Sequence, residues 1–473
     1  MSGLTDVPVD VLSPDRFRAV LTAEQWVAFS AGVERARKLF AGRTIWMVNS
    51  TARGGGVAEM LGALLPYVHG AGIDTRWVVI AGDPEFFRIT KCIHNHLHGA
   101  PGDSPVLSHE DRRHYEAVTE AGGRELCERI GERDIVVLHD PQTAGMIPMV
   151  RSRGVPTVWR CHVGLDMPND LARSTWRFLI PYVSRADAYV FSRRTFAWEG
   201  LDPARIHVIA PSIDPFSPKN ADMSPGHVAA ILAAAGLEEP TGDAPPEFNR
   251  LRGEVDRIRH TAGVHQETRL HWGMPLVVQV SRWDRLKDPI GVIQGFAEGV
   301  VPHCDAHLML AGPAFSGVAD DPESAAVYAE TEAYWRSLPE TVRALVHLAT
   351  LPMEDDEENA AIVNALQRRA TVVVQKSLAE GFGLTVAEAM WKGRPVVASR
   401  IGGIQDQIED GVTGFLLDDP HDVRTFGALV CRLLLDPPLA RRIGEAAQRR
   451  VREHFLGTRD MLQYVDLLGS LVA

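Results

Sequence analysis

The segment at residues 379–399, AEGFGLTVAEAMWKGRPVVAS, constrains the possible folds more than any other part of the chain. The apolar, β-branched residues at 371–375 just before it are typical of a strand buried on both faces of a parallel sheet. Gly381 and Gly383 then allow a sharp turn, and a helix is expected to begin near Leu384. A buried strand, a glycine turn and a helix in this order predict a doubly wound α/β domain.

Two carboxylates flank this glycine turn. Glu380 precedes it, and Glu388 lies inside the expected helix. Because a helix N-terminus presents unpaired N–H groups and a positive dipole end, it favours a bound phosphate. A nucleotide sugar fits the pattern, since Glu388 can accept hydrogen bonds from ribose hydroxyls and Glu380 from hexose hydroxyls. The diphosphate would then lie over the turn formed by Gly381, Phe382, Gly383 and Leu384.

Two other interpretations fit a pair of glutamates. The acids could be solvated side chains beside an ordinary turn, or they could be the acid/base pair of a hydrolase, with carboxyl groups roughly 5 to 10 Å apart. The motifs elsewhere in the chain favour the nucleotide sugar over both.

Two cations follow another predicted strand, at residues 276–280. Arg282 can make a forked contact to phosphate oxygens, and Lys287 can add a mobile positive charge nearby. Together they predict a diphosphate clamp, with Arg285 as a lower-ranked alternative to either. An ordinary salt-bridged loop would be preferred if the two glutamates were absent.

Polar residues also follow two predicted strands in the first half of the chain. Asp140 and Gln142 come after the strand at 135–138, and His162 comes after the strand at 157–161. Ligands of parallel sheets lie beyond the carboxyl ends of strands, so we expect these groups to face one site. By strand periodicity Arg160 shares a face with His162. We expect His162 to contact the transferred sugar, and Asp140, Gln142 and Arg160 to bind the acceptor; the alternative is satisfied polar residues at strand ends.

The first strand–turn–helix unit, at residues 44–65, contains three consecutive glycines at 54–56. A dinucleotide-binding fold is the competing interpretation, because Asp83 follows the second strand where a ribose-binding acid could lie. Consecutive glycines do not have the spacing of the dinucleotide fingerprint, so this alternative is weak.

Charge and composition exclude several classes of partner. A net charge of −12 argues against a nucleic acid or an anionic membrane as a partner. No apolar run approaches 18 residues and no signal peptide is evident, so a cytoplasmic protein is expected. The five cysteines are predicted to be free thiols. His94, His96 and His98 are expected to lie in a hydrogen-bonded loop rather than at a metal site.

Several motifs together resemble a known family. Glu380 and Glu388, with seven residues between them, resemble the signature of retaining GT-B glycosyltransferases of family four, as do the GRPVV step at 393–397 and the GVTGFL turn at 411–416. More specific resemblances, to trehalose synthases of the glycosyltransferring type and to retaining trehalose phosphorylases, lie in the first half of the chain. They are NSTARGGGVAEML at 49–61, HDPQ at 139–142, WRCHVGLDMPN at 159–169 and PSIDPFSPKN at 211–220.

This resemblance implies a GT-B fold of two Rossmann-like domains around a cleft. Residues 1–211 would form the acceptor-side domain and residues 212–454 the nucleotide-sugar domain, with the last helix, about 455–473, packing back on the first. Gly55 and Gly56 would lie beneath the donor diphosphate. The segment at about 222–270 is expected to be a surface excursion or a flexible linker.

The resemblance also implies an activity. The enzyme would move glucose from a nucleoside-diphosphate glucose, such as UDP-glucose, to glucose, and would form α,α-trehalose reversibly with retention of configuration. His162, Arg282, Lys287 and Glu380 would be its catalytic residues, with no cofactor and no metal required. The alternatives are phosphorolysis of trehalose, transfer to another small acceptor, and a non-catalytic sugar-nucleotide sensor. The donor base, UDP, ADP or GDP, stays open, and a homodimer is compatible with the sequence without being required by it.

Overall fold

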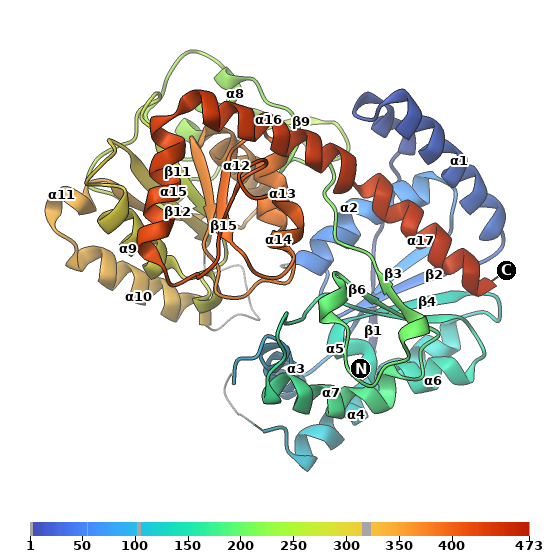
Figure 1. The fold of residues 1–473 in the computed structure, drawn as a ribbon. Helices are drawn as coiled ribbons and strands as arrows, with labels where there is room; N and C mark the ends of the chain where they lie inside the picture. The colour runs from blue at the N-terminus through green and yellow to red at the C-terminus, as the bar shows by residue number, and fades with distance from the viewer. Residues whose placement is uncertain (1–2, 54, 102–105, 315–322, 473) are drawn as a thin grey trace. The chain divides into compact units, whose positions relative to one another are not determined.

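The computed structural model describes residues 3–53, 55–101, 106–314 and 323–472. The chain divides into two compact units (Figure 1). Unit 1 comprises Met1–Ser212 together with Phe455–Ala473, and unit 2 comprises Ile213–His454. Each unit is an α/β domain built on its own seven-stranded sheet, within the described residues.

The sheet of unit 1 is parallel except for its first strand. That strand pairs antiparallel with its neighbour at the sheet edge, and the others run parallel. In spatial order the strands are β1 (Leu4–Val7), β3 (Thr75–Ile80), β2 (Ile45–Asn49), β4 (Ile135–His139), β5 (Thr157–Cys161), β6 (Ala188–Phe191) and β7 (Ile206–Val208).

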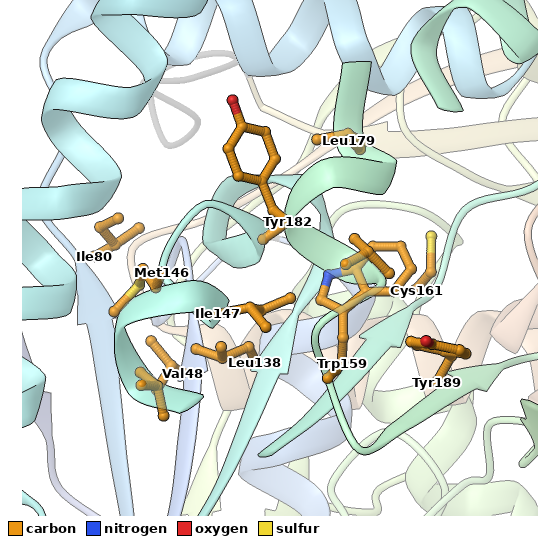
Figure 2. Close-up of a cluster of buried hydrophobic side chains, with 14 of the residues drawn as sticks. Val48, Ile80, Leu138, Met146, Ile147, Trp159, Cys161, Leu179, Tyr182 and Tyr189 are labelled. Atoms are coloured by element: carbon orange, nitrogen blue, oxygen red, sulfur yellow. The ribbon is translucent and has the colours of Figure 1, made fainter. Parts of the chain in front are cut away.

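Helices cover both faces of this sheet because its strands are apolar on both faces. Ile45 and Met47 of β2 point to one face, whereas Trp46 and Val48 point to the other. The first face packs against α1 (Ala23–Leu39), α2 (Gly56–Gly70) and α17 (Gly457–Val472), which lies alongside α1 in Figure 1. The second packs against α3 (Pro84–Leu97), α4 (His109–Arg129), α5 (Asp140–Ala144), α6 (Ile147–Ser152) and α7 (Asp170–Val183). Figure 2 shows part of this second core.

The sheet of unit 2 follows the same plan, with one antiparallel strand at its edge. Its strands, in spatial order, are β10 (Gly263–His265), β13 (Val346–Leu351), β12 (His307–Pro313), β11 (Leu276–Val280), β14 (Val372–Gln375), β15 (Val396–Ser399) and β16 (Phe415–Leu417). One apolar core joins this sheet to α9 (Pro289–Gly299), α10 (Glu323–Ser337), α15 (Val423–Leu435) and α16 (Pro437–His454). Further helices of the unit are α8 (Pro225–Ala234), α12 (Asp356–Arg369) and α13 (Leu384–Trp391).

The segment at 222–270 is an ordered part of unit 2 and not the flexible linker that was one of its two expected forms. Helix α8 packs on α12, and β10 extends the central sheet by pairing with β13. Between them lies a short hairpin of β8 (Glu247–Asn249) and β9 (Val255–Arg257). Glu238 forms a buried ion pair with Arg369 at 2.6 Å, so the segment is fixed by charge as well as by apolar packing.

Two other local features differ from the sequence prediction. The lead-in contains β1, an edge strand whose Thr5 and Asp6 are exposed and therefore give no apolar signal. The predicted histidine loop is the end of α3, a helix capped by the Asp83 side chain. His96 is buried there, with Nε2 3.0 Å from the carbonyl oxygen of Pro101.

The five cysteines are free, as predicted. Within the described ranges, no helix combines the length and the apolar character that crossing a membrane requires.

Candidate functional site

The predicted donor turn of unit 2 lies at the carboxyl end of β14. After Gln375 the chain passes through Glu380 to Gly383, which precedes the first turn of α13 and adopts φ of 83°. A side chain other than hydrogen is disfavoured at this φ, which explains the glycine. Helix α13 begins at Leu384, as predicted from the sequence.

A second turn, at Gly402 and Gly403, packs directly against the donor turn. The N–H of Gly403 donates to the carbonyl of Gly381 at 3.0 Å, and the side-chain amide of Gln407 donates to the carbonyl of Phe382. A Cβ placed on Gly402 would lie 1.8 Å from the carbonyl oxygen of Glu380. The backbones of the two turns are therefore in direct contact. This contact is possible only because Gly402 has no side chain.

Lys287 and Glu380, predicted separately as a phosphate contact and a sugar contact, form an ion pair with each other. The distance from Lys287 Nζ to Glu380 Oε2 is 2.5 Å, and both side chains are largely buried. The main chain of Lys287 is fixed in turn, because its carbonyl accepts a hydrogen bond from Gln279 at 2.9 Å. An ammonium group has three N–H bonds and a carboxylate has two oxygens, so each partner keeps hydrogen-bonding capacity for a ligand.

The two arginines near this pair have different surroundings. The side chain of Arg282 is 45% exposed, and its Nη2 lies 3.2 Å from Asp284 Oδ2. Arg285 instead makes a two-pronged ion pair with Glu330 of α10, with both distances 2.6 Å. The guanidinium of Arg285 is therefore held in a surface ion pair. Arg282 is the better candidate to bind a phosphate group.

Glu388 is nearly inaccessible, at 2% exposure, on the buried face of α13. Its Oε1 lies 3.8 Å from Nζ of Lys219. Sequence reasoning missed Lys219, although it lies within the PSIDPFSPKN motif. The lysine supplies a positive charge that stabilises the buried carboxylate.

In unit 1, Asp140, predicted to bind the acceptor, and His162, predicted to contact the transferred sugar, come together at the ends of β4 and β5; Gln142 follows Asp140 in α5. The backbone N–H of His162 donates to Asp140 Oδ1 at 2.7 Å. Asp140 adopts φ of 61°, unusual for a residue with a side chain, so the surrounding contacts hold it there. Burial raises the pKa of Asp140 to about 7, although the His162 N–H and the Arg160 charge oppose that rise.

Gln142 has a side-chain oxygen available for a further hydrogen bond. Its side-chain carbonyl oxygen is buried and has no hydrogen-bond partner among the described residues. A buried acceptor without a partner costs free energy, which a hydroxyl of a bound sugar would recover.

Arg160 does not have the surroundings expected of an acceptor contact. The side chain is fully buried, and it donates to His162 Nε2 at 3.1 Å, to the Tyr464 hydroxyl at 2.9 Å and to the carbonyl of Ile209 at 3.0 Å. The period of a strand gives the face of a residue and not its depth, so the sequence did not indicate that Arg160 is buried. Tyr464, on α17, was missed because it lies about 300 residues away in sequence.

Gly55 and Gly56, the remaining predicted donor residues, belong to unit 1 and precede or open α2. Both are exposed, and a Cβ on Gly55 would meet no atom within 4 Å. Its φ of 142° is a conformation open to glycine. Residue 54, the first glycine of this run, lies outside the described residues.

Two family models match the chain. The trehalose synthase N-terminal domain matches residues 47–198, and glycosyl transferases group 1 matches residues 265–450. The first range contains Asp140, Gln142 and His162, and the second contains the whole of the donor turn with Arg282 and Lys287.

The chain is also similar to complete enzymes. A trehalose synthase from Pyrococcus horikoshii is 35% identical over 440 residues, which make up 93% of this chain and 92% of that protein. A trehalose phosphorylase from Pleurotus sajor-caju is 27% identical over 85% of this chain and 54% of its own length. The structure of an alpha,alpha-trehalose-phosphate synthase (UDP-forming) from Burkholderia xenovorans, in complex with glucose-6-phosphate, gives a TM-score of 0.67 at 15% identity, covering 90% of this chain and 100% of that one.

The structural likeness shows the GT-B fold, and the family models show a glycosyltransferase that transfers a hexosyl group. At more than 30% identity over almost the whole of both chains, the relation to the Pyrococcus enzyme shows the family. The chain belongs to the trehalose synthase family of GT-B glycosyltransferases.

Proposed function

We propose that this enzyme transfers glucose from a nucleoside-diphosphate glucose to glucose and forms α,α-trehalose with retention of configuration. The observation that carries the proposal is the Lys287–Glu380 ion pair beside the glycine turn at the start of α13. It offers a cation for a diphosphate and an acid for sugar hydroxyls within one hydrogen-bonded unit.

The donor would be held by unit 2. Arg282 and Lys287 would contact the diphosphate together with the N–H groups at the start of α13, where the helix dipole also favours negative charge. Glu380 would accept from hexose hydroxyls, and Glu388 from the ribose. UDP-glucose is the donor we favour, because the Burkholderia enzyme with the same fold is described as UDP-forming.

The acceptor would be recognised by unit 1. The unpartnered carbonyl oxygen of Gln142 would accept a hydroxyl of glucose, and His162 would contact the transferred sugar. Asp140 fixes the backbone N–H of His162, so its contribution would be to orient the histidine as well as to bind hydroxyls.

The chemistry would be a same-face substitution at C1 of the donor glucose. The bond from C1 to the phosphate oxygen breaks and leaves an oxocarbenium-like carbon, while the electron pair goes to the departing nucleoside diphosphate. The 1-hydroxyl of the acceptor attacks C1 on the same face, and its proton passes to the leaving phosphate oxygen. Arg282 and Lys287 would stabilise the charge that develops on that phosphate, where such groups accelerate reactions most. If these cations and the helix dipole supply the positive charge, the step requires no metal or cofactor.

Phosphorolysis of trehalose is the second candidate, favoured by the similarity to the Pleurotus trehalose phosphorylase. Both reactions would use the same cations, with inorganic phosphate replacing the nucleoside diphosphate as the group that meets C1. Incubation of the enzyme with trehalose and either phosphate or UDP separates them, because only one combination yields glucose 1-phosphate.

The test of the main proposal is product detection by mass spectrometry. The enzyme is incubated with UDP-, ADP- or GDP-glucose and isotopically labelled glucose, and a disaccharide carrying one labelled hexose is expected. Trehalase digestion of the product confirms the α,α-1,1 bond. Absence of any disaccharide with all three donors, in a preparation of folded enzyme, would overturn the proposal.

A further inference from the structure

A chain of hydrogen bonds joins His162 to the C-terminal helix, entirely within unit 1. We propose that Arg160, anchored by Tyr464 of α17, fixes the neutral Nδ1–H tautomer of His162, so that the histidine meets the sugar as a hydrogen-bond donor. Arg160 and Tyr464 are then positioning residues. The contact to sugar rests on the proposed function, whereas the tautomer follows from the protein's own contacts.

The first step concerns the two nitrogens of the His162 ring. Nε2 lies 3.1 Å from Arg160 Nε and 3.1 Å from His139 Nδ1. A guanidinium is always charged and only donates, so the nitrogen that faces it must provide a lone pair. Arg160 Nε also lies 3.4 Å from His162 Nδ1, which could accept only in the other tautomer; the shorter contact to Nε2 favours Nε2 as the acceptor. In a neutral ring whose Nε2 accepts, the proton is on Nδ1.

His139 extends the same pattern. If His162 Nε2 accepts, its single lone pair is shared by two donors, Arg160 Nε and His139 Nδ1, each 3.1 Å away. His139 Nε2 then carries the lone pair of that ring. Burial and the Arg160 charge lower the pKa of His139 to about 3 and hold the pKa of His162 well below its usual range. Both rings are thus neutral, which a fixed tautomer requires.

The second step concerns what fixes Arg160. Its Nη1 donates to the Tyr464 hydroxyl at 2.9 Å and its Nη2 to the carbonyl of Ile209 at 3.0 Å. With the bond to His162 Nε2, every nitrogen of the guanidinium has a partner. Its plane, and hence the direction of the N–H that meets His162, is set by groups outside β5.

Asp460 lies one helical turn before Tyr464 and is also fully buried. Its two oxygens have no hydrogen-bond partner within the described residues, and the nearby charges of Arg160 and Arg459 favour its ionised form. Burial outweighs those charges and raises the pKa of Asp460 overall. Arg459 is fixed separately, since it donates to the carbonyl of Pro211 at 3.2 Å. Asp460 therefore lies near the guanidinium charge without a hydrogen bond to it.

A buried guanidinium costs free energy that an apolar side chain of similar volume would not. Stability alone gives no reason for Arg160 in this place. Orientation of His162 does, because an apolar residue could neither engage Nε2 nor select the tautomer.

The experiment measures the tautomer directly, by NMR of the full-length enzyme labelled with 15N in its histidine rings. The His162 signals are identified by their loss in His162→Gln. The expected spectrum has a protonated Nδ1 and an unprotonated Nε2 from pH 6 to pH 8. A protonated Nε2 or a doubly protonated ring would overturn the proposal. The experiment needs no substrate. Its result therefore tests the tautomer independently of the proposed reaction.

Tyr464→Phe tests the anchor, and Tyr182→Phe is the matched control. Each removes a hydroxyl that pairs with an arginine, at 2.9 Å for Arg160 and 2.8 Å for Arg112, and Tyr182 lies in the other core of unit 1. Tyr464→Phe is expected to mix the two tautomers of His162 and to lower kcat roughly 3- to 10-fold, as loss of about one hydrogen bond would, with the donor KM unchanged. The control is expected to leave the ring signals and kcat unchanged. Equal effects of the two variants, or an unchanged ring in Tyr464→Phe, would contradict the anchoring role.

Discussion

At the residue scale, the two arginines that follow β11 differ in what they contact. Arg282 is half exposed beside the donor turn, whereas Arg285 is held by Glu330. Arg282→Ala is expected to lower kcat by about 10²- to 10³-fold, because the cation would act on charge that develops as the phosphate leaves. Arg285→Ala is the matched control and should stay close to wild type. Steady-state kinetics of both variants check this, and a larger loss in Arg285→Ala would reverse the assignment.

Substitutions of Glu380 and Glu388 are expected to affect different steps, one turnover and the other binding of the donor. Glu388→Gln is expected to weaken binding of the nucleoside diphosphate by about 10- to 100-fold, since hydrogen bonds to a charged acceptor contribute about 1.5–3 kcal/mol. Glu380→Gln is expected to reduce kcat with a smaller effect on binding, because its partner Lys287 loses the ion pair that orients it. Calorimetric titration with UDP, followed by turnover assays, measures both; unchanged affinity in Glu388→Gln would remove the ribose assignment.

Asp140 should give the protein a pH-dependent stability. Its folded pKa of about 7 lies above the ordinary value of 3.8, so the folded state binds more protons than the unfolded state between those values. The contribution of this group is fully present below about pH 4 and is lost as pH rises through 7. Asp140→Asn, which keeps the acceptor for the His162 N–H and tolerates the positive φ, removes this dependence.

The measurement is the Tm of both proteins from pH 4 to pH 9. Relative to wild type, the Tm of Asp140→Asn should rise steadily up to about pH 7 and then stay level. Parallel curves across the whole range would show that the carboxyl does not titrate as described.

At the scale of elements, the conformation of the donor turn depends on its contact with the second turn, at Gly402 and Gly403. Gly402→Ala would place a Cβ against the Glu380 carbonyl, so it is expected to displace Glu380 and abolish most activity. Gly411→Ala is the control: its φ is also positive, at 75°, but a Cβ there meets no atom within 4 Å. Both variants carry a backbone cost of about 1–2 kcal/mol, measured by thermal unfolding, and only the first should lose turnover.

The segment at 222–270 should behave as part of the unit 2 core. Ile231 of α8 is fully buried, so Ile231→Ala is expected to lower the free energy of unfolding by about 2–5 kcal/mol. Val255→Ala, on the exposed hairpin, should change it by less than about 0.5 kcal/mol. Chemical denaturation of the two variants distinguishes a core element from the linker that the Pro- and Gly-rich sequence indicated; equal stabilities would support the linker.

At the scale of the whole molecule, the sequence predicted those features whose residues lie close together along the chain. The strand, the glycine turn and both glutamates lie within one continuous segment, 372–388, and the helix begins at the expected residue. The strands predicted at 135–138, 157–161, 276–280 and 371–375 were recognised from apolar runs, which are typical of sheets covered on both faces.

The sequence did not predict what depends on contacts between distant segments. Tyr464 and Arg160 are adjacent only in the folded chain, and Lys219 reaches Glu388 from the segment that precedes α8. The antiparallel edge strands β1 and β10 were missed for a related reason, because short strands with exposed residues carry little apolar pattern and are defined by their neighbours.

The most direct measurement is NMR of the reaction with UDP-glucose labelled with 13C at C1 and unlabelled glucose as acceptor. The proposed function predicts a single disaccharide in which the labelled carbon is α-linked to C1 of the acceptor, with formation that requires Lys287 and Glu380. A β-linked product, or labelled glucose released without transfer by the folded enzyme, would contradict it.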